Sequence, residues 1–207
     1  MTAAPPPLSC LALGDSYTIG EAVPAAARWP AVLVEQLRRV GVVIDDPRIV
    51  AVTGWTTDEL AQGMHDASLT PVYDLVTLQI GVNNQYRGRS AEDYRGEFAG
   101  LLARAIALAG DRPERVVVVS IPDWSVTRFA REQGRDPAKI AAALDAFNAI
   151  AHAQAWRAGA HFVDITPISR SHPELVADDG LHPSAAQYLL WVDAILPVVR
   201  KALDQTP

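Results

Sequence analysis

The chain has 207 residues, of which 49% are hydrophobic, and it carries a formal net charge of −6. This length and apolar content suit one packed domain, so we expect a single domain over residues 1–207 with a flexible, proline-rich segment at 1–7. The acidic balance disfavours nucleic-acid binding, which needs a basic stripe. No stretch approaches the roughly 20 apolar residues of a transmembrane helix, so we expect no stable membrane insertion.

The sequence contains one cysteine, Cys10, inside an apolar run. An intrachain disulfide and a cysteine-built metal site are therefore excluded, and we expect Cys10 to be a small core residue. The start of the chain lacks the positive charge and the long apolar run of a secretory signal. We expect a cytoplasmic protein, unless a signal was removed ahead of residue 1.

Short apolar runs alternate with longer segments of helical periodicity along the sequence. In chain order they predict a strand at 8–13, a helix at 29–40, a strand at 48–52, a short helix at 57–64 capped by Thr57, and a strand at 74–80. They continue with a helix at 90–109, a strand at 115–121, a helix at 136–158 capped by Asp136, a strand at 161–165 and a helix at 184–203. Five strands that alternate with helices predict a parallel sheet with helices on both faces.

In such sheets, ligands bind beyond the carboxyl ends of the strands. Residues able to carry chemistry follow all five predicted strands: Ser16 the first, Gly54 and Trp55 the second, Asn83 and Asn84 the third, Trp124 the fourth, and Asp179 and His182 the fifth. We therefore expect these side chains to gather at one edge of the sheet.

The candidate nucleophile, Ser16, lies in the sequence Gly14-Asp15-Ser16-Tyr17. A serine beside a glycine just past a strand fits a tight turn at a helix start, where its hydroxyl is exposed and its amide points outward. Taken alone, the pattern is more typical of an ordinary turn.

A base for this serine is found in the sequence Asp179-Gly180-Leu181-His182-Pro183. An imidazole can take the proton of a serine hydroxyl near neutral pH, and a carboxylate can fix its tautomer. A separation of three residues allows one turn to present both side chains together. The alternative is a loop with a capping aspartate and a surface histidine. Asp178 is a rival to Asp179, one residue further from His182.

Acyl transfer also needs donors that meet the negative charge on the carbonyl oxygen. The candidates are the amides of Ser16 and Gly54 and the side-chain amide of Asn83. Gly54 has no side chain, so a substrate can approach its backbone closely. Either residue could instead serve an ordinary turn.

Together, these segments resemble four blocks of the GDSL, or SGNH, family of esterases and lipases. The first block matches Gly14-Asp15-Ser16, with Tyr17 where the name has leucine; the others match Gly54-Trp55-Thr56-Thr57, Gly81-Val82-Asn83-Asn84, and Asp179 with His182. The blocks span residues 14–183. One departure is Asn84, because this block usually ends in aspartate and this chain has no carboxylate there.

The resemblance implies a three-layer α/β/α sandwich with a five-stranded parallel, flavodoxin-like sheet. It implies hydrolysis of esters or thioesters without a metal or cofactor, with Ser16, Asp179 and His182 as the catalytic residues and Ser16, Gly54 and Asn83 as the oxyanion donors. A nucleophile elbow of the α/β-hydrolase type fits less well, because position 18 is threonine rather than glycine. The remaining histidines show no metal-ligand spacing: His65, His152, His161 and His172.

The substrate is indicated only by aromatic residues. The segment 122–135 is a long insertion at the active edge and carries Trp124 and Phe129, while Tyr17, Trp55 and Tyr86 are expected nearby. These side chains could line a substrate pocket or simply pack the loop onto the domain. We expect a small-molecule ester with a short acyl chain.

Several alternatives stay open at this point. They are an acyl thioesterase, a lysophospholipase, a carbohydrate O-deacetylase, and a ligand-binding module on the same fold. A nucleotide-binding protein is disfavoured, because the phosphate-binding glycine motifs are absent from the sequence. The sequence does not determine the oligomeric state or whether residues 122–135 act as a lid.

Overall fold

The computed structural model of this chain describes residues 6–204. Its five strands all run parallel in the order β2-β1-β3-β4-β5. They are β1 (Cys10–Gly14), β2 (Arg48–Ala51), β3 (Leu75–Gln79), β4 (Val116–Val119) and β5 (His161–Val163). This order, with the first strand between the second and third, is that of a flavodoxin-like sheet, and the expected fold class is confirmed.

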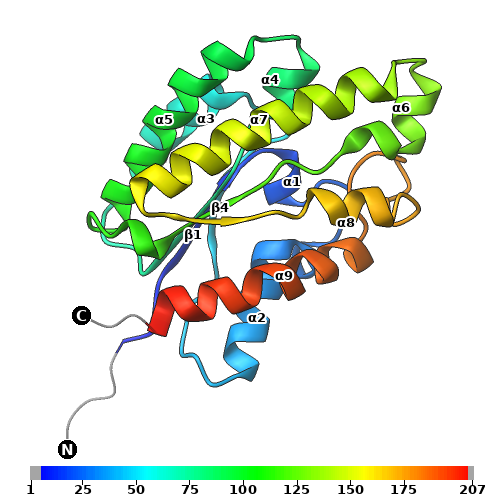
Figure 1. Ribbon diagram of the computed structural model, residues 1–207. Coiled ribbons are helices and arrows are strands. Elements are labelled where there is room, and N and C mark those ends of the chain that lie inside the picture. The colour runs from blue at the N-terminus through cyan, green and yellow to red at the C-terminus, as the bar shows by residue number, and fades with distance from the viewer. Residues whose placement is uncertain (1–5, 205–207) are drawn as a thin grey trace, which may run out of the picture.

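Helices cover both faces of the sheet (Figure 1). On one face, α2 (Trp29–Arg39) packs against α9 (Ala185–Asp204). The other face carries α3 (Thr57–Asp66), α5 (Ala91–Leu108) and α7 (Pro137–Ala158). The short helices are α1 (Ser16–Ile19), α4 (Val82–Tyr86), α6 (Arg128–Glu132), α8 (Thr166–Ser171), and the 3-10 turns η1 (Ala25–Ala27), η2 (Pro113–Arg115) and η3 (Trp124–Val126).

The centre of the sheet is fully covered. Every residue of β1, β3 and β4 is buried, and β4 consists of four consecutive valines. Strands covered on both faces carry continuous apolar runs for this reason. Cys10 is a buried free thiol, and burial raises its pKa to about 12.

The predicted elements all exist, and their ends lie within two residues of the observed ones. The predicted cap of α3 is wrong, because Thr56 rather than Thr57 caps this helix. The amide of Thr56 donates to Glu59 over 2.8 Å, and together they form a capping box. Thr57 is instead the first helical residue and is buried.

The short helices between the main elements are too brief for periodicity to reveal. The insertion at 122–135 contains two of them, η3 and α6. Among residues 6–204, no helix combines the length and apolar character needed to cross a membrane. Most of the flexible segment expected at 1–7, namely residues 1–5, lies outside the described residues.

Candidate active site

Ser16 is the first residue of α1 and follows β1 after a sharp turn. Asp15 caps this helix, with its carboxylate accepting from the amide of Tyr17 over 3.1 Å. Gly14 is required, because a Cβ there would lie 2.5 Å from the carbonyl oxygen of Gln79. The turn therefore places the Ser16 hydroxyl at the carboxyl end of a central strand.

Asp179 and His182 form a tight pair in the loop before α9. The imidazole Nδ1 lies 2.6 Å from a carboxylate oxygen of Asp179, and the other oxygen accepts from the amides of Leu181 and His182 over 2.9 and 3.0 Å. Partial burial raises the pKa of Asp179, but its hydrogen bonds with His182 and these amides outweigh that effect and hold the pKa below its usual value. Asp178 contributes only its backbone carbonyl, which accepts from Arg128 over 2.6 Å.

This loop is fastened at several points. Gly180 has a φ of +72°, and its carbonyl accepts from the amide of Phe129 over 3.0 Å. The amide of Ala177 donates to the carbonyl of His182 over 2.7 Å. From α9, the hydroxyl of Tyr188 donates to the carbonyl of Tyr17 over 3.0 Å. The loop and the turn at Ser16 are therefore joined through the C-terminal helix.

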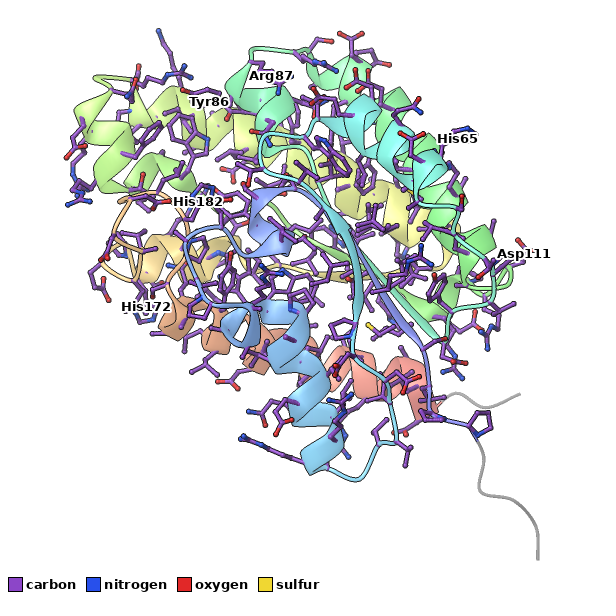
Figure 2. The ribbon with its side chains drawn as sticks, turned by 180° about the vertical axis from the view of Figure 1, so that it is seen from behind. His65, Tyr86, Arg87, Asp111, His172 and His182 are labelled. Atoms are coloured by element: carbon purple, nitrogen blue, oxygen red, sulfur yellow. The ribbon has the colours of Figure 1, made fainter. Side chains whose placement is uncertain are left out.

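Ser16 and His182 line one cavity of about 230 Å³. The ring of Tyr17 lies edge-on to the imidazole, with ring centroids 5.7 Å apart. Figure 2 shows His182 at the same end of the molecule as Tyr86, away from His65 and Asp111. Within residues 6–204, no hydrogen bond joins Ser16 to His182. Such bonds are often long in unliganded enzymes and tighten when substrate binds.

The three expected oxyanion donors all border this cavity. Gly54 has a φ of +88°, and among the described residues its amide has no partner. The Asn83 side chain donates to the carbonyl of Trp55 over 2.9 Å, which leaves its second N–H for another acceptor. Ser16 is the first residue of its helix, where the amide has no acceptor within the helix.

Aromatic and aliphatic side chains form the rest of the cavity wall: Tyr17, Val82, Tyr86, Trp124, Phe129 and Leu181, with Thr53 at its edge. Trp55 was expected here, but its ring lies against Gly63 of α3, so this expectation is corrected. Trp55 contributes its backbone carbonyl, which accepts from Asn83, while its ring packs where Gly63 has no side chain.

The insertion builds one side of this wall. The indole N–H of Trp124 donates to the side chain of Gln85 over 2.9 Å. Its ring lies beside those of Tyr86 and Phe129, with centroids 5.5 and 6.3 Å apart. Arg135 covers the outside of this group, with its guanidinium 4.2 Å from the centre of the Tyr86 ring. The sequence did not predict four residues of the site, although each is within two positions of a predicted one: Thr53, Val82, Gln85 and Leu181.

No group of three or more His, Cys, Asp and Glu side chains in the described part of the chain could hold a metal ion.

A family model described as the GDSL-like lipase/acylhydrolase family matches residues 12–190. The structure of a lipase/acylhydrolase from Enterococcus faecalis is similar, with a TM-score of 0.74 and 18% identity over 97% of this chain and 99% of that chain. AlinE4, an SGNH-hydrolase family esterase, gives a TM-score of 0.68 and 23% identity over 97% of this chain and 99% of that chain. Axe2, an acetylxylan esterase from Geobacillus stearothermophilus, gives a TM-score of 0.71 and 17% identity over 94% of each chain. No curated protein sequence matches this chain.

Proposed function

This chain belongs to the GDSL-like lipase/acylhydrolase family and is a carboxylic ester hydrolase, and from this premise we propose that it cleaves short-chain acyl esters through an acyl-serine intermediate on Ser16. The observation that carries the proposal is the placement of Ser16 and of the Asp179–His182 pair on one apolar cavity.

The first half of the reaction forms the acyl-enzyme. His182 takes the proton of the Ser16 hydroxyl through Nε2 as the oxygen attacks the acyl carbon. Asp179 holds the proton on Nδ1, which fixes the tautomer and supports the imidazolium that forms. His182 then protonates the leaving alcohol as the tetrahedral intermediate collapses.

The second half repeats these steps with water. His182 removes a proton from water, the hydroxide attacks the acyl carbon, and Ser16 is released with its proton restored. In both halves the negative charge on the carbonyl oxygen meets the amides of Ser16 and Gly54 and the free N–H of Asn83. These donors are fixed before substrate arrives, because each is held by its backbone or by a second hydrogen bond.

The cavity supports a short acyl chain. A cavity of roughly 150 Å³ holds a six-carbon ring, so about 230 Å³ holds an acyl group of up to about eight carbons with its ester group. Its wall of Val82, Tyr86, Trp124 and Phe129 is largely apolar, and its lining residues include no Asp, Glu, Lys or Arg. Both properties favour an uncharged acyl group.

The proposal is tested with a chain-length series of chromogenic esters, from two to sixteen carbons, run beside thioesters, lysophospholipids and acetylated oligosaccharides. We expect the highest kcat/KM at about four to eight carbons. Ser16→Ala should lower kcat by about 10⁴-fold or more and should abolish labelling by a fluorophosphonate. A labelled Ser16→Ala protein, or one with the wild-type turnover, would refute the assignment of the nucleophile.

The same panel separates the alternatives. A thioesterase, a lysophospholipase and an O-deacetylase differ in leaving group, whereas a binding module would neither react with the phosphonate nor turn over any ester. A single domain over 1–207 and a cytoplasmic location stay predictions.

A further inference from the structure

A buried polar network lies behind the oxyanion donors and joins three elements. Asn84 of α4 accepts from the amide of Thr57 over 3.1 Å, and its NH₂ group donates to the Thr57 hydroxyl over 2.6 Å. The same NH₂ group donates to the carboxylate of Glu97 on α5 over 3.2 Å, and the Thr57 hydroxyl also donates to that carboxylate. Asn84 and Thr57 are 0% and 1% exposed.

The network ties together the two chain segments that carry the oxyanion donors. Thr57 lies three residues after Gly54, and Asn84 directly follows Asn83. The bond from Asn83 to the carbonyl of Trp55 crosses the same junction. A shift between these segments would move the Gly54 amide relative to the Asn83 side chain.

The chemistry of the partners fixes what residue 84 must be. The amide of Thr57 can only donate, and the carboxylate of Glu97 accepts both of its hydrogen bonds in this network. Position 84 therefore needs one acceptor and one donor, which asparagine provides. An aspartate there would bring a second carboxylate about as close to Glu97 as the present 3.2 Å contact, and like charges at this range oppose each other.

A cationic side chain lies close to Glu97. Arg89 lies 3.9 Å from its carboxylate and also pairs with Asp58 of α3 over 2.6 Å. The amide of Arg89 donates to the carbonyl of Asn84 over 2.9 Å, so this cation is anchored to the same helix end.

We propose that Asn84 and Glu97 are paired positioning residues: the amide at position 84 on α4 bonds to the carboxylate on α5. Together with Thr57, this pair holds the Gly54 amide and the Asn83 side chain at a fixed distance from each other. The pair gives a physical reason for asparagine at position 84, where the resemblance implies an aspartate. The proposal rests on the proposed function, because it assigns these residues to the oxyanion site.

An exchange of the two groups tests the proposal. The variants are Asn84→Asp, Glu97→Gln and the double variant, which restores one carboxylate and one amide in swapped positions. Glu92→Gln is the matched control, because it lies on the same helix with a side chain that is 83% exposed. For each protein we would measure kcat per fluorophosphonate-labelled site, KM for a short ester, and the melting temperature.

We expect Asn84→Asp to lower kcat by about 10- to 100-fold with little change in KM, as misplaced oxyanion donors do. Glu97→Gln alone should lower kcat only a few-fold. The double variant should recover kcat to within about threefold of the wild type. Counting only labelled sites separates this effect from a loss of folded protein.

Two results would overturn the pairing: an Asn84→Asp protein with the wild-type kcat, or a double variant no better than Asn84→Asp. If Asn84→Asp alone does not fold, adding Glu97→Gln should restore a folded enzyme that the fluorophosphonate labels. A double variant that also fails to fold or to label would count against the pairing. A wild-type protein that neither labels nor hydrolyses esters would instead refute the proposed function.

Discussion

The hydroxyl of Tyr188 in the last helix donates to the backbone carbonyl of Tyr17, beside Ser16, over 3.0 Å, and the two tyrosines are 171 positions apart in the sequence. Tyr188 is completely buried. Its hydroxyl thus joins α9, which follows the His182 loop directly, to the turn that carries Ser16. The bond fixes the turn at Ser16 and the loop of His182 relative to each other.

Tyr188→Phe should therefore destabilise the protein by about 1–3 kcal/mol, because it leaves a buried carbonyl without its donor. Chemical denaturation measures this change. Tyr73→Phe is the comparison: the Tyr73 hydroxyl accepts from Arg48 over 3.2 Å in a partly exposed setting, so its loss should cost less than half as much. An equal decrease in the free energy of unfolding for both variants would show that the Tyr17–Tyr188 bond stabilises the fold no more than the Arg48–Tyr73 bond does.

The identity of the catalytic carboxylate is tested by two adjacent residues. Asp179→Asn should lower kcat by roughly 10³–10⁴-fold, because the amide cannot hold His182 in the reactive tautomer. Asp178→Asn changes the same charge one position away and should leave kcat within about twofold, since its side chain has no contact with His182 in the described structure. Steady-state kinetics on a short ester decides; a reversed ranking of the two variants would show that Asp178 is the partner.

Phe129 of the insertion lines the cavity in which we propose that the acyl group binds. Phe129→Ala should enlarge the cavity and move the optimum of the ester series by about two to four carbons towards longer chains, at the cost of affinity for short ones. Trp156→Ala provides the control, because Trp156 lies on α7 with 77% of its surface exposed and does not line the cavity. An unchanged chain-length profile in Phe129→Ala would place the acyl chain elsewhere.

Arg135 lies 4.2 and 5.6 Å from the ring centres of Tyr86 and Trp124 and closes the aromatic wall from outside. Exposed cation–π contacts contribute about 0.5–1 kcal/mol, so Arg135→Ala should lower kcat/KM for the preferred ester by about two- to fivefold. The loss should lie mainly in KM. Lys139→Ala, which removes a cation that is 86% exposed and pairs with Asp136, should leave both constants unchanged. If Arg135→Ala lowered kcat and left KM unchanged, a role of Arg135 in substrate binding would be contradicted.

The sequence predicts the sheet and most of the site for a physical reason. Apolar runs and glycine stops define the parallel strands, and parallel strands bring their carboxyl ends to one edge. Residues directly after those ends, such as Ser16, Gly54 and Asn83, are therefore placed by topology alone. The close spacing of Asp179 and His182 does the same for the acid–base pair.

Contacts that depend on side-chain direction could not be predicted in this way. Trp55 and Trp124 both follow strands, yet only Trp124 lines the cavity, because the Trp55 ring packs on Gly63. Glu97 lies within a long helix, and nothing in its local sequence distinguishes it from the exposed Glu92. Its part in the network emerges only when α5 is laid beside α3 and α4.

Asp15, next to Ser16, should give the protein a specific dependence of stability on pH. Burial raises its pKa to about 7, against the opposing effect of backbone hydrogen bonds, whereas an unfolded aspartate titrates near 3.9. Between about pH 4 and pH 7 the folded state therefore holds a proton that the unfolded state has lost, so the contribution of Asp15 to the free energy of unfolding falls as the pH rises through that range.

Asp15→Asn cannot ionise, and its side-chain oxygen can still accept from the Tyr17 amide. It should raise the melting temperature at pH 8 by about 2–4 °C or more relative to the wild type and leave it nearly unchanged at pH 4. Asp45→Asn, an exposed aspartate, is the control and should shift neither value; parallel melting curves for the wild type and Asp15→Asn across this range would show that Asp15 is ionised throughout.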